Sequence, residues 1–223
     1  AIGAYIKETN PDYLYTHLLP TLQGNTLIEW EGGYYRAFNK IEGYALSVLD
    51  HKLQVEEAAK QFAKFTYVLK DFDANSLKDT LVQFHDLNFR YQQFSEAIQN
   101  GNTHRIEQSQ EEIKLLLSLK HYVDTYNNYI QHKDVKKRVT HHDTKISNVL
   151  FNMIDGQEQA ICVIDLDTTM SGYYISDVGD MCRTCLCPVS EEERDLNKIW
   201  VDGEKWQALK TGYLHYMQDE HLK

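Results

Sequence analysis

The chain has 223 residues, 42% of them hydrophobic, which is enough to bury the core of one domain or of one and a half. With 33 acidic and 23 basic side chains its formal net charge is −10, and so acidic a chain is a poor candidate for nucleic-acid binding, which depends on neutralising phosphates. No apolar run reaches the length of a membrane span, no basic and then apolar leader opens the sequence, and four cysteines do not indicate a disulfide scaffold, so we expect a cytoplasmic protein.

The N-terminal part predicts short strands. Two runs rich in aromatic and β-branched residues, Thr26–Trp30 and Tyr34–Asn39, flank Glu31-Gly32-Gly33 and predict a β-hairpin. Before them, Ala1–Lys7 is too short to assign by itself, and Asn10-Pro11 breaks any helix there. The sequence has no initiator Met and begins in the middle of a pattern, so we expect a fragment of a longer chain.

The middle of the chain has a helical pattern. Apolar residues recur with the period of a helix over Leu53–Leu69, and Leu87–Ile98 predicts a second helix that ends at Asn100-Gly101-Asn102. Phe72–Asp86, between them, is irregular. Thr103–Ile130 then predicts one long helix. We expect its buried face to consist of Ile113, Leu116, Leu117, Leu119, Tyr122 and Val123.

The C-terminal part also predicts helices. Ser176–Thr184 begins a helix that Pro188 ends, and the acidic run Ser190–Glu193 resembles the first turn of another. Lys205–Tyr216 is amphipathic and predicts the last helix. From Tyr44 onward the chain is therefore expected to be helical, apart from one hairpin.

That hairpin carries the polar residues of most interest. The apolar runs Val149–Phe151 and Ile161–Ile164 flank a turn with Asp155-Gly156. Polar residues stand at the outer end of each run: His141, Asp143 and Asn148 before the first, Asp165 and Asp167 after the second. Because a hairpin brings its two outer ends side by side, we expect these residues to converge on one small site.

A base, an amide and a carboxylate clustered in this way suit phosphoryl transfer. Asp143 can accept a hydrogen bond from a substrate hydroxyl and orient it for in-line attack. Asn148 and Asp165 offer hard oxygen ligands for Mg²⁺ that bridges nucleotide phosphates, and Lys145 can meet the transferred phosphate as a point charge. The spacing H-x-D-x4-N followed by I-D is that of kinase catalytic loops, although Asp165-Leu166-Asp167 replaces D-F-G. The alternative is a surface hairpin with polar ends.

Two motifs resemble a known family. H-x-D-T-K-x-x-N-V-L-F over His141–Phe151 and V-I-D-L-D-T over Val163–Thr168 resemble the small-molecule kinases of the aminoglycoside phosphotransferase and choline kinase superfamily, and are most similar to its N-acetylhexosamine kinase group. The resemblance runs from Tyr34 onward. It implies an α+β, protein-kinase-like fold with ATP in the cleft between two lobes. Residues 1–43 would then be the end of the small lobe and the hinge, and residues 44–223 the helical large lobe.

The resemblance also assigns residues away from the hairpin ends. It implies His141 as a structural brace near the metal-binding Asp, and Asp177 as a brace of the catalytic-loop backbone. Asp167 is a second carboxylate that binds a second ion or fixes the loop. The adenine contacts implied are the backbone groups of Phe38, Asn39 and Ile41 and the side chains of Leu150 and Ile164.

Further residues are weaker candidates for substrate or metal binding. Tyr173 and Tyr174 directly follow the metal-binding segment and can stack on a sugar ring. Arg183 can reach a sugar or a phosphate, or form a surface ion pair. The spacing Cys182-x2-Cys185-x-Cys187 suits zinc or buried thiols on a helix face, and we favour buried thiols because no second pair of ligands accompanies it.

The predicted function is an ATP- and Mg²⁺-dependent phosphotransferase that acts on a hydroxyl of a small molecule, in the first place an N-acetylhexosamine-type sugar. Alternatives are an aminoglycoside, choline or homoserine acceptor, or a non-catalytic binding module with a kinase fold. No G-x-G-x-x-G loop occurs among the 11 glycines, and Ala4–Lys7, which imitates the lysine-bearing strand of kinases, is interpreted as a helix end or a frayed terminus. We therefore expect most of the small lobe to be missing and these residues alone to be inactive. The sequence leaves the oligomeric state open.

Overall fold

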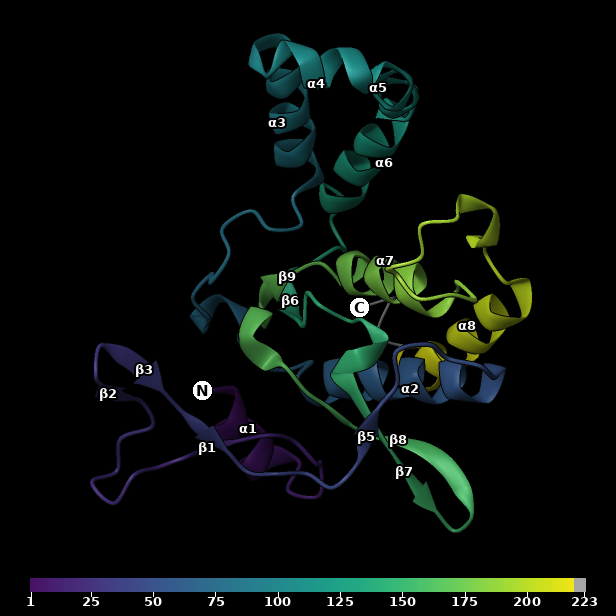
Figure 1. Ribbon diagram of the computed structural model, residues 1–223. Coiled ribbons are helices and arrows are strands. Elements are labelled where there is room, and N and C mark those ends of the chain that lie inside the picture. Colours follow the sequence, from purple (N-terminus) through teal and green to yellow (C-terminus); the bar gives the residue numbers. More distant parts are fainter. Residues whose placement is uncertain (219–223) are drawn as a thin grey trace. The chain divides into compact units, whose positions relative to one another are not determined.

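The computed structural model describes residues 1–218 (Figure 1). Its contacts divide the chain into two compact units: Ala1–Lys78 with Arg138 and the residues after it form the first, and Asp79–Lys137 form the second. Among the described residues, all strands lie in the first unit, and the second is helical. Among residues 1–218, every helix is too short or too polar to cross a membrane.

Short elements make up the N-terminal part of the first unit. They are α1 (Ile2–Thr9), β1 (Leu18–Leu19), β2 (Ile28–Trp30), β3 (Gly33–Tyr35), β4 (Ala37–Phe38) and β5 (Tyr44–Ala45). β2 and β3 pair antiparallel, which confirms the hairpin predicted around Gly32, while residues 37–38 leave that hairpin and pair with β1. The segment Ala4–Lys7 is helical within α1, whose Ile6 is fully buried.

Helix α2 (Lys52–Val68) is the centre of the first unit's core. It packs along α8 (Gly203–Met217) and against the long hairpin. The apolar stripe predicted at positions 55, 58, 59, 62, 65 and 69 is buried, and Ala63 and Val68 extend the buried face. Burial of each large side chain stabilises the fold by about 1.5–3 kcal/mol. Gly212 permits the close approach of α8, because a Cβ there would lie 2.1 Å from the Glu56 carbonyl oxygen.

The long hairpin consists of β7 (Val149–Ile154) and β8 (Gln157–Val163), which pair antiparallel, with β5 on the other edge of β7. Asp155 and Gly156 form its turn with φ values of 51° and 78°, as expected of an Asp-Gly turn. The predicted hairpin is therefore confirmed. Because Val149 lies opposite Val163, the residues before β7 and after β8 meet at one end of the sheet.

A second strand pair and a helix frame that end of the hairpin. β6 (Arg138–Thr140) pairs antiparallel with β9 (Met170–Gly172), and α7 (Tyr174–Cys185) follows directly, beginning before the predicted start at Ser176. Only glycine fits at position 172, because neighbouring side chains leave no room for a Cβ. A Cβ at this position would lie 2.3 Å from Thr140 Oγ1 and 2.5 Å from His142 Nε2.

The second unit consists of α3 (Leu87–Asn100), α4 (Thr103–Gln108), α5 (Gln110–Ser118) and α6 (Lys120–Ile130). The prediction of α3 is confirmed, but that of one helix over residues 103–130 is wrong. The backbone leaves helical geometry at Ser109 (φ −108°, ψ 25°) and at Leu119 (φ −90°, ψ 6°). At the second break, the Ser118 hydroxyl donates to the Leu115 carbonyl at 2.7 Å, so a side chain competes with the backbone ladder.

The buried face predicted for this segment is also largely wrong. Leu116, Leu117 and Tyr122 are exposed, Ile113 and Leu119 are half-buried, and Val123 alone is buried within α4, α5 and α6. Each break changes the direction of the chain, so residues that share a face on a continuous helix no longer do so.

The helix predicted from Ser190 is absent. Residues 191–192 form a turn, and Leu196–Lys198 form a single 3-10 turn before α8. The reason lies in the side chain of Glu193, whose Oε1 accepts the N–H groups of Arg194 and Asp195 at 2.9 Å each. Such local bonds replace the first turn of a helix. The helix predicted over residues 205–216 is confirmed as α8.

Candidate active site

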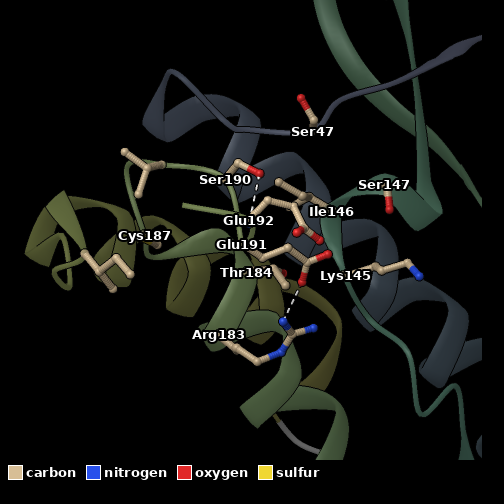
Figure 2. Close-up of a pocket in the computed structure, with 12 residues that line it drawn as sticks. Ser47, Lys145, Ile146, Ser147, Arg183, Thr184, Cys187, Ser190, Glu191 and Glu192 are labelled. Carbon is tan, nitrogen blue, oxygen red and sulfur yellow. Dashed lines mark hydrogen bonds and ion pairs between the residues drawn. The ribbon is translucent and has the colours of Figure 1, made fainter. Parts of the chain in front are cut away.

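A cavity of about 420 Å³ opens beside the start of the long hairpin (Figure 2). Four parts of the first unit contribute polar side chains to its lining. They are Ser47 after β5, Lys145 and Ser147 before β7, Arg183 on α7, and Ser190, Glu191 and Glu192 on the segment after α7. Hydroxyls and charges of both signs therefore surround one space.

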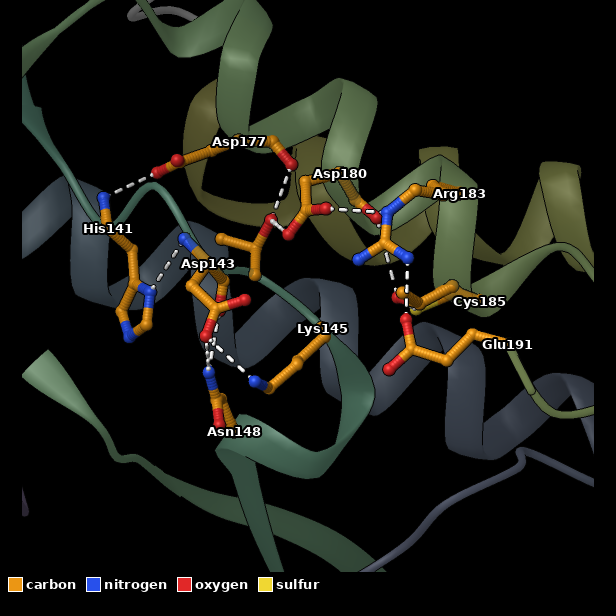
Figure 3. A network of polar contacts seen from close by, with 11 residues as sticks. His141, Asp143, Lys145, Asn148, Asp177, Asp180, Arg183, Cys185 and Glu191 are labelled. Atoms are coloured by element: carbon orange, nitrogen blue, oxygen red, sulfur yellow. Dashed lines mark hydrogen bonds and ion pairs between the residues drawn. The ribbon is translucent and has the colours of Figure 1, made fainter. Parts of the chain in front are cut away.

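Residues 141–148, which we call the polar loop, contribute Lys145, Ile146 and Ser147 to the lining of this cavity, and α7 holds the backbone of the loop (Figure 3). The Asp177 carboxylate accepts the N–H groups of His141 and His142 at 2.8 Å each, and Thr144 Oγ1 donates to the Asp177 carbonyl at 2.7 Å. Burial raises the pKa of Asp177 to about 7, against the opposite effect of the two N–H donors. His142 has a positive φ of 66°, so this arrangement fixes an unusual backbone turn.

His141 connects the polar loop to the end of β8. Its Nδ1 accepts the Asp143 N–H at 3.2 Å, so Nε2 carries the proton and donates to the Ile164 carbonyl at 2.9 Å. The ring is fully buried and lies edge-on to Phe62 and Phe65 of α2. Burial lowers its pKa, so the imidazole is neutral and acts here as a spacer between two segments.

Asp143 is held on one side only. Its Oδ2 accepts Asn148 Nδ2 at 2.8 Å and pairs with Lys145 Nζ at 3.0 Å. No other residue of the described chain bonds its Oδ1, and the side chain is 26% exposed. Asp143 is also the main cause of the raised pKa of Lys145. One carboxylate oxygen is thus fixed and the other is open.

Asp165 follows β8, and a backbone hydrogen bond of its neighbour Ile164 links it to Asn148. The Ile164 N–H donates to the Asn148 carbonyl at 2.9 Å, and Asp165 follows in the left-handed region at φ 59°. Its carboxylate is exposed and forms no bond with another side chain of residues 1–218, while its charge contributes to the raised pKa of Lys145. The structure therefore brings Asp143, Asn148 and Asp165 together.

The available oxygens fit a magnesium ion. Asn148 donates through Nδ2 to Asp143, which leaves its Oδ1 without a bond inside residues 1–218, and its backbone carbonyl accepts from Ile164, the residue before Asp165. Oxygen ligands of this kind suit Mg²⁺, which keeps several waters and takes further oxygens from phosphates. Within residues 1–218, no group of three His, Cys, Asp or Glu side chains is arranged to hold a metal ion.

Asp167 has a different environment, because its carboxylate pairs with Arg36. Arg36 lies between β3 and β4, and its guanidinium stands 5.1 Å from the centre of the Phe38 ring. Both side chains, with Asp167 and Lys7, line a second cavity of about 520 Å³. Sequence reasoning did not find Arg36, since a single arginine in a strand has no local signal for a partner 131 positions away.

The residues expected to hold adenine lie on short strands and beside β7. Phe38 is 41% exposed in β4, and the Asn39 N–H donates to the His17 carbonyl at 3.2 Å. Ile41, Leu150 and Ile164 are half-buried. The Asn39 N–H is thus already bonded within the structure.

The remaining candidates lie outside these groups. Tyr174 is buried, with the Arg138 guanidinium 5.7 Å from its ring centre, and neither it nor Tyr173 lines either of the two cavities. The four cysteines are free thiols. Burial raises the pKa of Cys185 to about 12, which keeps the thiol protonated when no metal is bound.

Comparison with known proteins adds a family and a fold. The family model described as "Phosphotransferase enzyme family" matches residues 12–209. Among solved structures, the chain is similar to an aminoglycoside phosphotransferase from Alicyclobacillus acidocaldarius, with 14% identity over 96% of this chain and 62% of that chain, at a TM-score of 0.59. It is also similar to a microcompartment-associated aminopropanol kinase, with 17% identity over 95% and 62%, at a TM-score of 0.56.

A third similar structure is an amicoumacin kinase in complex with AMP-PNP and Ca²⁺, with 13% identity over 96% of this chain and 59% of that chain, at a TM-score of 0.56. The chain thus spans less than two thirds of the length of each of these three proteins. At such identities the likeness concerns the fold, which is the α+β, protein-kinase-like fold predicted from the motifs.

Proposed function

The chain belongs to the phosphotransferase enzyme family, and we propose that the protein transfers the γ-phosphoryl group of ATP, in the presence of Mg²⁺, to a hydroxyl of a small molecule. The observation that carries this proposal is the state of Asp143. One of its carboxylate oxygens is held by Asn148 and Lys145, and the other is open to a ligand. A fixed acceptor with one open oxygen is what the orientation of an attacking hydroxyl requires.

In this proposal the polar loop positions the reacting groups. Asp143 Oδ1 accepts the hydrogen bond of the acceptor hydroxyl and takes its proton as the oxygen bonds to phosphorus and the bond to the leaving phosphate oxygen breaks. Lys145, held 3.0 Å from Asp143 Oδ2, supplies positive charge near the transferred group. His141 and Asp177 act through the backbone and hold the loop in place.

Asn148 and Asp165 would hold the magnesium ion through the oxygens that the structure leaves unbonded. When bound, Mg²⁺ neutralises charge on the nucleotide phosphates. Asp167 is a weaker candidate ligand, because Arg36 pairs with it. We propose that it fixes the metal-binding segment through that pair.

For the nucleotide, we keep the assignment of adenine to the backbone of Phe38, Asn39 and Ile41 and to the side chains of Leu150 and Ile164. Two observations are in favour of ATP: the similar amicoumacin kinase holds AMP-PNP, and β5, which follows residues 38–41, pairs with β7. Since Asn39 N–H bonds His17, Phe38 and Ile41 are the stronger of the three backbone candidates. In the two-lobed fold this segment is the hinge that ends the small lobe at residue 43.

The acceptor is proposed to be a polyhydroxylated molecule, with an N-acetylhexosamine-type sugar first. The hydroxyls of Ser47, Ser147 and Ser190, which line the 420 Å³ cavity, support this choice because they can pair with sugar hydroxyls. A second candidate is an amino alcohol or an aminoglycoside. The Glu192 carboxylate, which lines the cavity and has no ion-pair partner in residues 1–218, favours a cationic amine.

The experiment uses the complete natural protein with ATP and Mg²⁺ and follows ADP release with amino sugars, N-acetylated sugars, aminoglycosides and amino alcohols. We expect turnover with one class and no turnover in the Asp143→Asn variant. Nucleotide binding is measured in parallel by calorimetry. Binding of ATP without turnover on any acceptor would contradict the proposal and would indicate a binding module that keeps the fold without the activity.

A further inference from the structure

Arg183, near the end of α7, bonds two carboxylates at once. Its Nε donates to Asp180 Oδ1 at 2.9 Å, and its Nη1 donates to Glu191 Oε2 at 2.6 Å (Figure 3). Asp180 lies on the same helix, whereas Glu191 lies on the irregular segment that follows it. The guanidinium therefore ties this segment to α7.

Asp180, the first of these two carboxylates, also contacts the polar loop. Asp180 Oδ2 lies 3.4 Å from Thr144 Oγ1, and Thr144 stands between Asp143 and Lys145 in the sequence. One carboxylate oxygen of Asp180 thus faces the loop, and the other holds Arg183.

The Glu191 end faces the cavity. Glu191 and Lys145 both line the 420 Å³ space, and the charge of Glu191 adds to the effect of Asp143 in raising the pKa of Lys145 (Figure 2). The side chains of Arg183 and Glu191 are 51% and 48% exposed. An ion pair so exposed adds little to folding stability, so its loss should leave the protein folded.

We propose that Arg183 and Glu191 are a positioning pair that holds the wall of the acceptor cavity formed by residues 188–192 at a fixed distance from Asp143. The inference rests on the proposed function, since it takes this cavity as the acceptor site. Arg183 acts through Glu191 and does not touch the transferred phosphoryl group. Loss of the pair releases the wall, which weakens binding of the acceptor and leaves Asp143 and the nucleotide residues in place.

Arginine is specifically suited to this role, because two different nitrogens of one planar group serve two carboxylates. A lysine has one ammonium group and can pair with only one of them. We therefore expect Arg183→Ala to raise the acceptor KM by about tenfold and Arg183→Lys by about threefold, with kcat and the KM for ATP changed by less than about twofold.

The test is steady-state kinetics on the complete natural protein with ATP, Mg²⁺ and the best acceptor of the panel described above. The variants are Arg183→Ala, Arg183→Lys, Glu191→Gln and the double variant of the first and third. In the double variant the acceptor KM should rise no further than in Arg183→Ala, because both changes remove the same pair. The matched control is Arg194→Ala, which changes the same segment outside the cavity lining and should leave all three constants unchanged.

Two results would overturn the inference. One is an acceptor KM in Arg183→Ala equal to that of Arg194→Ala, and the other is a fall in kcat at constant acceptor KM, which would place Arg183 in the chemical step. If thermal unfolding reveals that Arg183→Ala does not fold, Glu191→Gln decides, since its side chain is half exposed and its loss leaves the fold intact. A wild-type protein that phosphorylates no acceptor would instead overturn the proposed function itself.

Discussion

The polar loop and the segment 188–199 line the same cavity, but different contacts hold them. The loop is anchored by buried groups: Asp177 is 3% exposed, and Thr144 and His141 are 1% and 0% exposed. The segment is anchored by surface ion pairs, such as that of Arg183 with Glu191. Buried bonds in a low dielectric fix geometry far more firmly than pairs that compete with water.

From this difference we expect the loop to serve the reaction and the segment to serve acceptor binding. The loop that carries Asp143 is fixed by buried bonds when the chain folds, whereas the segment 188–199 depends on exposed ion pairs for its position. Enzymes place chemistry on rigid groups and specificity on segments of this second kind. Changes in the loop should therefore affect the reaction or the fold, and changes in the segment should affect acceptor binding alone.

The largest expected effect is that of Asp143→Asn in the complete protein. We expect kcat to fall by about 10²–10⁴-fold, because orientation and deprotonation of the hydroxyl matter in the transition state, while nucleotide affinity stays near its starting value. Single-turnover kinetics and calorimetry measure the two quantities. Turnover equal to the wild type would remove Asp143 from the mechanism.

Metal dependence is the next test of the rigid wall. Asp165→Ala should abolish Mg²⁺-dependent nucleotide binding, and Asn148→Ala should weaken it less, because a carboxylate contributes a charge that an amide lacks. Titration of each variant with ATP at increasing Mg²⁺ concentration measures this. If neither change alters the Mg²⁺ dependence, the open oxygens of Asp165 and Asn148 do not bind the ion.

The anchor of the loop should also be visible in stability. Asp177→Ala leaves the N–H groups of His141 and His142 buried without an acceptor, which costs about 2–4 kcal/mol of unfolding free energy. Urea unfolding measures this, with Glu57→Gln as the control, since that carboxylate pairs with Lys60 near the surface and should matter little. Equal midpoints for the two variants would mean that the loop keeps its backbone without Asp177.

Two glycines offer a sharper version of the same test. Gly172→Ala should destabilise the protein by about 1–3 kcal/mol, because its Cβ would overlap Thr140 Oγ1 and His142. Gly179→Ala, in α7 with open space around it, should stabilise by about 0.5–1 kcal/mol. Thermal unfolding of both variants gives the sign of each change. A stabilising Gly172→Ala would contradict the tight packing around the loop.

Local patterns account for what the sequence predicted. The long hairpin follows from two apolar runs around Asp155-Gly156, and it places Asn148, which bonds Asp143, at the same end of the sheet as the segment that leads to Asp165. The stripe of α2 follows from helical spacing. The roles given to the site residues remain predictions, because a pattern and a geometry name candidates and only a measurement assigns their function.

The helix breaks, the turn at Glu193 and the ion pairs of two arginines were not predicted. They depend on hydrogen bonds of side chains with nearby backbone groups or on contacts with residues far away in the sequence. The helical spacing of apolar residues continues through Ser109 and Leu119, so it could not predict that the helix breaks at these two residues. Glu193 belongs to an acidic run typical of a helix start, yet it bonds the next two N–H groups and forms a turn. The partners of Arg36 and Arg183 are set by the tertiary fold, which neither residue's neighbours in sequence specify.

The smallest expected effect concerns Lys198, which pairs with Glu193 at 3.4 Å within the segment 188–199. Its side chain is 57% exposed, so water screens the attraction and ordering of the long side chain offsets what remains. Lys198→Ala should therefore leave the urea midpoint and the acceptor KM unchanged, in contrast to Arg183→Ala, because Lys198 does not line the cavity. Unfolding curves at low and at high salt test this: a destabilisation that disappears in high salt would mean that the Lys198–Glu193 pair also holds the segment, contrary to this expectation.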